Sequence, residues 1–245
     1  MKRYILVLFS FISVYAFNHC KAPEKATESI VIKNTNMDNE SAKISISLVK
    51  GEYYNHPTFV IWKEDMNEKY VETIFVTKSY ASGIYGYEMV GDSVWRSVSG
   101  KSIQPAALPY WTYKKGKING KTYVPTPDNP FVDGYTGATP KQNFKFETGG
   151  NTAKDSYRIL LEINQTADWN NYWTNNKYPD NPAYKHSAQP SIIYAVSINN
   201  ADSVFYMNPI GHGDPKGETG KLYTDLSTLT TVKEILESVK IVINR

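Results

Sequence analysis

Short apolar stretches separated by turn signals constrain the fold of this chain more than any other feature. Residues 41–50 alternate between apolar and polar side chains, and Ile44, Ile46 and Leu48 share one face. This period of two is typical of a strand with one buried face. Comparable stretches predict further strands at residues 58–63, 70–78, 144–148, 157–165, 191–198, 204–207 and 240–244. Short strands in this number predict an all-β, immunoglobulin-like β-sandwich.

The strand at residues 157–165 allows its two faces to be assigned. One face carries Tyr157, Ile159, Leu161 and Ile163, and we expect this face to lie in the interior of the sandwich. Leu160 lies on the opposite face, which we expect to meet solvent. Nearer the amino terminus, the strands at residues 58–63 and 70–78 flank a polar turn and predict a β-hairpin.

Two long stretches, residues 80–129 and 169–187, carry Gly, Pro and aromatic residues without a strand period. Loops of this length inside a compact domain are uncommon and are often functional. The 19 tyrosines and 5 tryptophans of the chain suit β-sheets and ligand platforms alike. Residues 211–221 predict a glycine-rich loop, and residues 231–238 predict one or two helical turns. We therefore expect a single β-sandwich domain over residues 41–245, with long aromatic-rich loops.

The first 20 residues predict export from the cytoplasm. Lys2 and Arg3 precede an uncharged, mostly apolar run at residues 4–16, which is shorter than the roughly 20 apolar residues that span a hydrocarbon core. A charged start followed by a short apolar run is typical of a secretory signal. We therefore expect a signal segment at residues 1–20 and a flexible tether at residues 21–40. The expected location is the periplasm or the outer cell envelope.

The leader offers two cleavage points, and the sequence leaves both open. Cleavage after Ala16 fits the small residues that a signal peptidase reads. Cys20 is the only cysteine of the chain, and a lone cysteine before a polar tether is typical of a lipoprotein anchored to a membrane. An unpaired thiol is otherwise unusual in an exported protein, so lipidation of Cys20 is the favoured prediction.

Composition argues against several classes of protein. No second cysteine can form a disulfide, so packing alone must stabilise the domain. The net charge of +3 falls to about +1 when the two basic residues of the leader are removed, which gives no concentrated basic face for nucleic acid. The chain has no G-x-S-x-G nucleophile motif. The histidines after the leader show no metal-ligand spacing; they are His56, His186 and His212. The sequence therefore offers no candidate catalytic residue and no candidate metal site.

Several segments, taken in order, resemble one family. They are residues 57–65, 70–75, 107–111, 132–141 and 190–194, of which the most specific contain Trp62-Lys63-Glu64-Asp65 and Asp133-Gly134-Tyr135-Thr136-Gly137-Ala138-Thr139-Pro140. This family consists of predicted periplasmic proteins of unknown function, whose genes often lie near those for flavin transferases and PepSY-type membrane proteins. The resemblance runs from about residue 43 to the carboxyl terminus. It implies an extracytoplasmic sandwich whose partners are a flavin transferase and a membrane redox protein.

Residues 133–139 also resemble the acceptor sequence of proteins that carry FMN on threonine through a phosphoester. In that pattern an Asp precedes a Ser/Thr-Gly-Ala-Ser/Thr core, and the final hydroxyl receives the FMN. The resemblance implies that the final hydroxyl here, that of Thr139, is the acceptor. It implies an FMN site made of Asp133, Thr136, Gly137, Ala138 and Thr139.

The physical demands of an FMN acceptor are compatible with this stretch. Gly137 and Ala138 leave room for close approach by another protein, and Pro140 biases Thr139 towards an extended conformation. Three neighbouring aromatic residues are candidates for stacking on a flavin ring: Tyr135, Tyr110 and Trp111. The alternative is an ordinary tight turn, in which Asp and Thr side chains bond the local backbone.

Three functions are therefore compatible with the sequence. The first is an accessory or electron-carrier protein of a flavin-linked redox system, in which the protein holds the flavin and tunes it. The second is a non-catalytic cell-envelope binding module for a glycan or a protein partner, with the aromatic loops as its contact surface. The third is a structural partner of a membrane complex that binds no ligand.

Lipidation of Cys20 is directly testable. We expect the native protein to fractionate with membranes, and Cys20→Ala to release it in soluble form, because one acyl-modified cysteine would be the only anchor. Fractionation of cells that express the two forms measures this. A Cys20→Ala protein that remains equally membrane-bound, or a mature protein that starts at Phe17, would contradict the prediction.

Overall fold

The structure, a computed structural model, describes residues 27–31, 42–86, 88–90, 94–96, 98–150 and 156–244. The predicted signal segment, Cys20 included, lies outside the described residues. Of the predicted tether, only strand β1 (Thr27–Val31) is described. Within the described part of the chain, no helix has the length and apolar character needed to cross a membrane.

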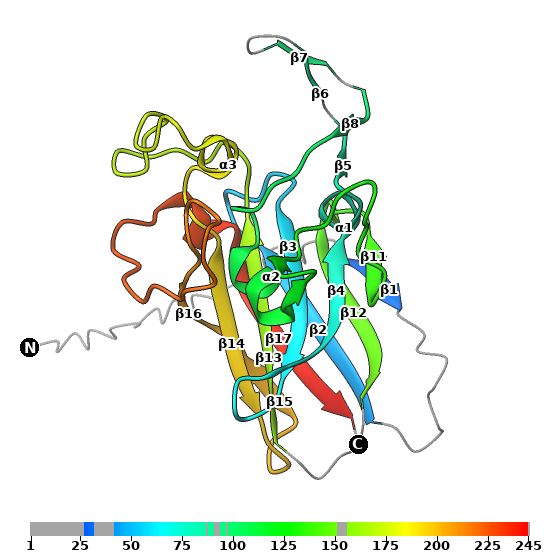
Figure 1. Ribbon diagram of the computed structural model, residues 1–245. Coiled ribbons are helices and arrows are strands. Elements are labelled where there is room, and N and C mark those ends of the chain that lie inside the picture. Colours follow the sequence, from blue (N-terminus) through cyan, green and yellow to red (C-terminus); the bar gives the residue numbers. More distant parts are fainter. Residues whose placement is uncertain are drawn as a thin grey trace, which may run out of the picture.

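Two sheets form the body of the protein (Figure 1). The five-stranded sheet has the order β1, β12 (Asn143–Gly150), β2 (Ala42–Lys50), β17 (Leu236–Asn244) and β15 (Val204–Tyr206). The six-stranded sheet has the order β11 (Tyr135–Gly137), β4 (Tyr70–Thr77), β3 (Thr58–Glu64), β13 (Tyr157–Asn164), β14 (Ile192–Ile198) and β16 (Asn208–His212). The pairs β1–β12 and β11–β4 are parallel, and the other pairs of the two sheets are antiparallel. The predicted all-β sandwich is confirmed.

Short elements lie in the loops between these strands. The helices are α1 (Lys78–Ser82), α2 (Pro109–Lys115), α3 (Pro182–Ser187) and the 3-10 turn η1 (Thr231–Glu234). Three small two-stranded sheets are β5 (Ile84–Tyr85) with β8 (Gly100–Lys101), β6 (Glu88–Val90) with β7 (Val94–Arg96), and β9 (Lys117–Ile118) with β10 (Lys121–Thr122). The stretch predicted as a long loop at residues 80–129 therefore contains both helical and extended elements.

The core between the two sheets follows from the alternation of the strands. Ile44, Ile46 and Leu48 of β2 are buried, as the period of two predicts. They meet an aromatic cluster built from both sheets, in which Phe75 of β4 and Phe146 of β12 have ring centroids 4.3 Å apart. Aromatic pairs at such distances contribute beyond their buried area, so this cluster joins the two sheets at their centre.

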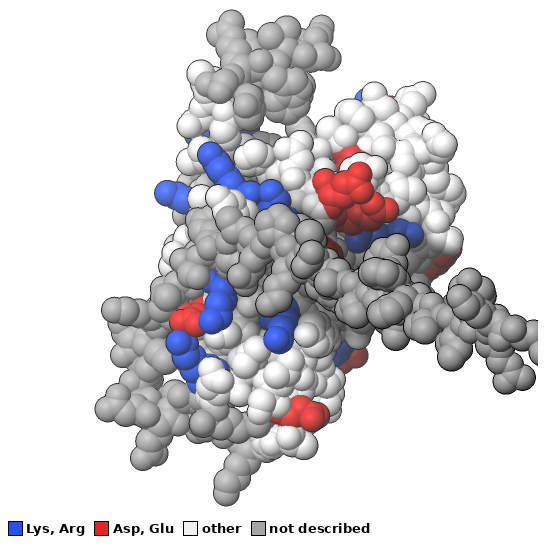
Figure 2. All heavy atoms as spheres, turned by 180° about the vertical axis from the view of Figure 1, so that it is seen from behind, with Lys and Arg blue, Asp and Glu red and all other residues white. Residues whose placement is uncertain are grey.

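The outer face of the five-stranded sheet carries charged side chains instead. Glu147 of β12 accepts ion pairs from Lys43 on the neighbouring β2, at 2.8 Å, and from Lys145 two residues away on β12, at 2.7 Å. Seen from behind, the described surface shows blue and red side chains in separate small groups (Figure 2). Opposite charges on neighbouring strands stabilise a sheet, so paired charges take the place of an apolar core on this face.

The outer face of the six-stranded sheet is covered by a third layer. We call this the cover layer; it consists of α1 and residues 104–131. Trp62 of β3 and Leu160 of β13 pack against Leu108 and Trp111 of the cover layer in a second buried cluster. Figure 1 shows α2 lying across these central strands, on the side away from the five-stranded sheet. The protein therefore has three layers, and its six-stranded sheet lies in the middle.

This third layer corrects the prediction for Leu160. Leu160 and Leu161 both have 0% of their surface exposed, so the expectation that Leu160 meets solvent is wrong. The reason is that the cover layer replaces solvent on that face. The sequence does carry a sign of this arrangement, because β13 contains the continuous apolar run Ile159-Leu160-Leu161, and such runs are typical of strands buried on both faces.

Two other local predictions were wrong in part. The helical turns expected at residues 231–238 are limited to η1, because β17 begins at Leu236 and pairs with the end of β2. The glycine-rich loop expected at residues 211–221 begins inside β16, which forms the sheet edge beside β14. In both cases pairing with a distant strand decides the local conformation.

Because β13 is buried on both faces, substitutions at two neighbouring residues should cause similar losses of stability. Leu160→Ala and Leu161→Ala should each lower the free energy of unfolding by about 2–5 kcal/mol, because each removes buried surface and leaves a cavity. Val71→Ala, on an exposed position of β4, is the control and should change it by less than about 0.5 kcal/mol. Urea denaturation measures all three, and a small loss at Leu160 alone would contradict the three-layer arrangement.

Candidate functional site

The predicted FMN-acceptor stretch lies at an edge of the six-stranded sheet. Its middle forms β11, which pairs in parallel with Phe75, Val76 and Thr77 of β4. Asp133 and Ala138 are exposed. The structure thus brings the five predicted residues together along one edge strand and its two flanks, rather than in a mobile loop tip.

The glycines of this stretch are explained by packing within the protein. A Cβ atom on Gly137 would lie 2.9 Å from the Phe75 ring, and one on Gly134 would lie 2.9 Å from the Thr73 carbonyl oxygen. Both distances are shorter than real side chains tolerate, so β11 approaches β4 this closely only because these positions lack a side chain. The space that Gly137 leaves open is therefore filled by Phe75.

Thr139 is half-buried and lies where the stretch turns towards β12. Its hydroxyl donates a hydrogen bond to the Pro57 carbonyl oxygen at 3.2 Å. The next residue is held as well, since the Tyr54 hydroxyl donates to the Pro140 carbonyl oxygen at 2.8 Å. The end of the stretch is thereby tied to the loop that precedes β3, while the lone pairs of the Thr139 oxygen accept no hydrogen bond from the described residues.

Asp133, at the other end of the stretch, is paired with the cover layer. Its carboxylate lies 3.2 Å from the Lys115 ammonium group, which belongs to the last turn of α2. The same ammonium group lies 4.4 Å from the centre of the Phe131 ring. Because the Asp133 side chain is 72% exposed, this surface ion pair contributes little to stability and leaves the carboxylate accessible.

Only one of the three aromatic residues predicted to stack on a flavin is accessible. Tyr110 and Trp111 lie in α2 and are buried, and the Trp111 indole N–H donates to Thr73 Oγ1 at 3.0 Å. They serve the contact between the cover layer and the sheet, so the expectation that they stack on a ligand is wrong. Tyr135 of β11 is exposed, and its ring centre lies 5.9 Å from that of Phe75.

A buried carboxylate beneath α2 was missed by the sequence analysis. Glu162 of β13 is fully buried and accepts hydrogen bonds from the Tyr110 N–H at 3.2 Å and the Trp111 N–H at 2.7 Å. It also accepts one from the Ser191 hydroxyl at 2.6 Å. Gly213 completes the enclosure, since a Cβ atom there would lie 2.5 Å from Ser191 Oγ and 3.1 Å from Glu162 Oε1.

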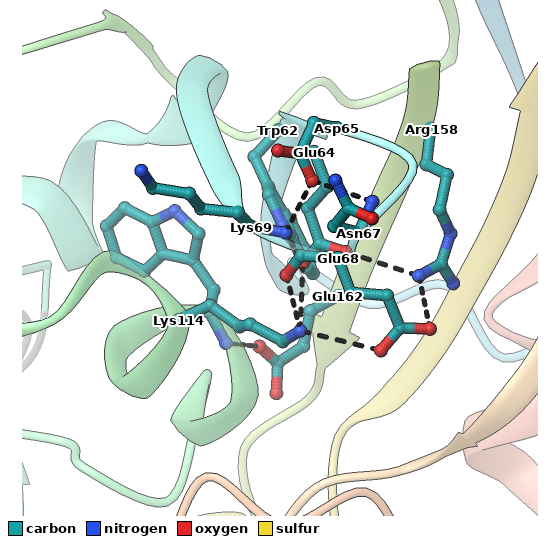
Figure 3. A network of polar contacts seen from close by, with 10 residues as sticks. Trp62, Glu64, Asp65, Asn67, Glu68, Lys69, Lys114, Arg158 and Glu162 are labelled. Carbon is teal, nitrogen blue, oxygen red and sulfur yellow. Dashed lines mark hydrogen bonds and ion pairs between the residues drawn. The ribbon is translucent and has the colours of Figure 1, made fainter. Parts of the chain in front are cut away.

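A second buried carboxylate, that of Glu64 on β3, lies in the same outer face of the sheet (Figure 3). It accepts from the Trp62 indole N–H at 3.0 Å, and it pairs with Lys114 at 3.5 Å and with Arg158 at 3.4 Å. Glu68, in the β3–β4 turn, lies 2.8 Å from Arg158 and 3.9 Å from Lys114. These contacts join the hairpin, β13 and α2 in one polar network.

The environments of the two carboxylates differ in charge. Glu64 faces two cationic side chains, whereas Glu162 is met by neutral donors alone among the described residues. Burial raises the pKa of the Glu162 carboxyl to about 7, against the opposing effect of its three hydrogen bonds. Both groups are enclosed and cannot meet a substrate, so the network holds α2 on the sheet rather than performing catalysis.

A sequence signal for this network existed. Glu64 and Glu162 are charged residues within or at the end of otherwise apolar strand sequences. Charged residues are almost never fully buried unless they are paired or hydrogen-bonded, so their positions indicate partners that must come from elsewhere in the chain. The partners of Glu162, two backbone N–H groups and a hydroxyl from distant segments, had no local signal.

One histidine takes a structural position. His212 is buried and its ring stacks on that of Tyr223, with centroids 5.1 Å apart. Across the residues that the structure describes, no three His, Cys, Asp or Glu side chains gather in a way that would hold a metal ion.

Comparisons of this chain with protein-family models, with curated proteins and with solved structures find no match. The family resemblance drawn from the sequence therefore stays a prediction.

The raised pKa of Glu162 predicts how stability depends on pH. Between the ordinary carboxyl value and about 7, the folded protein binds a proton at Glu162 that the unfolded chain has released. The free energy of unfolding should therefore fall as the pH rises through this window, by at most roughly 3 kcal/mol. Glu162→Gln removes this titration.

Urea denaturation at pH 5 and pH 8 tests this prediction. Burial lowers the pKa of His186 and of His212. The contribution of these two histidines to the free energy of unfolding therefore rises with pH, in the wild type and in Glu162→Gln alike. The difference between wild type and Glu162→Gln at each pH removes the histidine contributions. A difference that does not change with pH would show that Glu162 stays ionised throughout.

Proposed function

We propose that this protein is an exported accessory or electron-carrier protein of a flavin-linked redox system, with FMN joined by a phosphoester to the Thr139 hydroxyl. The proposed location is the periplasm or the outer cell envelope, with a lipid anchor on Cys20. The protein would position the flavin, and the flavin would carry the electrons.

One observation carries this proposal: the acceptor-like stretch is an exposed edge of the sheet, not part of the core. Asp133 and Ala138 are exposed, and Thr136 and Thr139 are half-buried. A hydroxyl that must enter the active site of another enzyme needs such a position. An edge strand on a rigid sheet also suits a flavin that is attached by one enzyme and must then be contacted by a second protein.

The state of the Thr139 hydroxyl is compatible with acceptor chemistry. Its proton is directed at the Pro57 carbonyl oxygen, so its lone pairs remain available for attack on phosphorus. In the transfer, the threonine oxygen forms the new P–O bond, the leaving group of the FMN donor departs, and a base of the transferase takes the hydroxyl proton. Only a local shift of Thr139 away from Pro57 is required.

The residues around Thr139 fit a flavin that projects into solvent. Tyr135 is the one candidate stacking partner that is exposed, and Asp133 is available for recognition by a transferase. Tyr110 and Trp111 are committed to the cover layer. We therefore propose contacts with a flavin transferase and a membrane redox protein along the β11 edge.

Mass spectrometry tests the proposal directly. When the protein is coexpressed with a flavin transferase, the tryptic peptide of residues 122–141 should carry a group of FMN mass, and fragmentation should place it on Thr139. Thr139→Ala and Thr139→Val should abolish the modification because they lack the hydroxyl. Thr139→Ser, which keeps it, and Thr136→Ala, which leaves the acceptor intact, should retain the modification.

Stability provides the matched control. Each Thr139 variant that lacks the hydroxyl loses the hydrogen bond to Pro57, and its free energy of unfolding should fall by about 0.5–1.5 kcal/mol. A loss of this size leaves the fold intact, so an absent modification cannot be attributed to unfolding. An unmodified peptide from cells that hold the transferase would show that the Thr139 hydroxyl is only a structural turn group.

A further inference from the structure

The loop that leads from β13 into α3 exposes two large aromatic rings close together. Trp169 is 44% exposed and Tyr172 is 52% exposed, whereas the neighbouring Trp173 is buried. Three residues of chain span at most about 11 Å, so the two exposed residues lie within the reach of one extended ligand. We call residues 169–176 the aromatic loop; it lies beyond the strand ends, next to α3 (Figure 1).

The aromatic loop is held rigidly by Asn170. The side-chain oxygen of Asn170 accepts from the N–H groups of Tyr172 and Trp173 at 2.9 and 2.7 Å, and its amide N–H₂ donates to Thr228 O and Thr230 Oγ1 at 2.9 and 3.0 Å. The Trp173 indole N–H adds a bond to Thr228 Oγ1 at 3.2 Å. A surface fixed in this way loses little conformational entropy when a ligand binds.

The Tyr172 ring is fixed from one side. The Lys177 ammonium group lies 3.2 Å from the centre of this ring and donates to the Tyr172 carbonyl oxygen at 3.1 Å. The backbone before the loop is held in an unfavourable conformation, since Ala167 has a φ of 59°. Strain of this kind persists where the surrounding structure enforces it and is common at binding sites.

The aromatic loop also carries exposed polar side chains. Within the part of the chain that the structure describes, the side chains of these residues are exposed and have no hydrogen-bond partner: Asn171, Thr174, Asn175 and Asn176. Each Asn amide offers two donors and an acceptor, and the Thr hydroxyl offers both roles. The aromatic loop therefore combines exposed rings with unused hydrogen-bonding groups.

We propose that the aromatic loop binds a neutral oligosaccharide. A sugar ring has an apolar C–H face, which fits an aromatic ring, and hydroxyl groups, which fit free amides. No residue from Trp169 to Asn176 is charged, and the adjacent Lys177 ammonium group is engaged with the Tyr172 ring and the Tyr172 carbonyl oxygen. The groups offered to a ligand are therefore aromatic rings, amides and a hydroxyl, which suit a neutral sugar. This site is independent of Thr139 and of the proposed function.

A titration of the full-length protein with neutral hexasaccharides of glucose, mannose, xylose and N-acetylglucosamine tests this proposal. Tryptophan fluorescence and calorimetry should detect binding of at least one of them, with little dependence on salt because the ligand is uncharged. Trp169→Ala and Tyr172→Ala should each lower the affinity for the oligosaccharide about tenfold or more, because each removes one stacking contact. Asn171→Ala should also weaken it.

Tyr206→Ala provides a matched control, because Tyr206 is an exposed tyrosine on β15, in the other sheet. This variant and Thr139→Ala should bind like the wild type, and thermal unfolding should show that all variants are folded. Failure to bind any of the four sugars would overturn the proposal. So would unchanged affinity in both aromatic variants, or capture of a protein by this loop in place of a sugar.

Discussion

The Glu162 carboxylate accepts hydrogen bonds from the first backbone N–H groups of α2, and the arrangement of the three layers depends on this contact. The N–H groups at the start of a helix have no partner within the helix, and a buried carboxylate without donors is costly. Each group therefore satisfies the other. Lys114 and Arg158 hold Glu64 in a similar way, so the cover layer is docked by polar contacts within an apolar interface. Once it is docked, β3 and β13 are buried on both faces.

This arrangement separates the stable part of the protein from the parts that carry the proposed functions. The central strands are enclosed between the five-stranded sheet and the cover layer, and the buried carboxylates of Glu64 and Glu162 are engaged in structural contacts. The acceptor-like stretch lies on an edge strand, and the aromatic loop lies beyond the strand ends. Both surfaces are fixed by a few hydrogen bonds to the rigid body, Thr139 to Pro57 and Asn170 to Thr228 and Thr230. Rigid scaffolds with functional peripheral segments are common among β-sandwiches.

The sequence predicted the strands of the two main sheets well where the side-chain period was clear. The strands expected near residues 41–50, 58–63 and 157–165 all exist, with ends that differ by one or two residues. The prediction that Leu160 meets solvent was wrong, because a side-chain period of two separates the two faces of a strand but does not show what covers each face. Of the candidate site, the stretch at residues 133–139 was found by its motif, whereas its position on β11 required knowledge of which strand it pairs with.

The sequence by itself determined the strand pattern, the apolar faces that form the core and the candidate stretches for function. These are local properties, written in the spacing of neighbouring side chains. Only the tertiary structure decided that the space beside Gly137 is filled by Phe75, that Tyr110 and Trp111 are buried, and that Glu162 meets α2. Each of these facts joins residues that are far apart in the sequence, by 51 positions in the case of Glu162 and Trp111. Contacts over such separations follow from how the layers pack, which no local pattern of residues records.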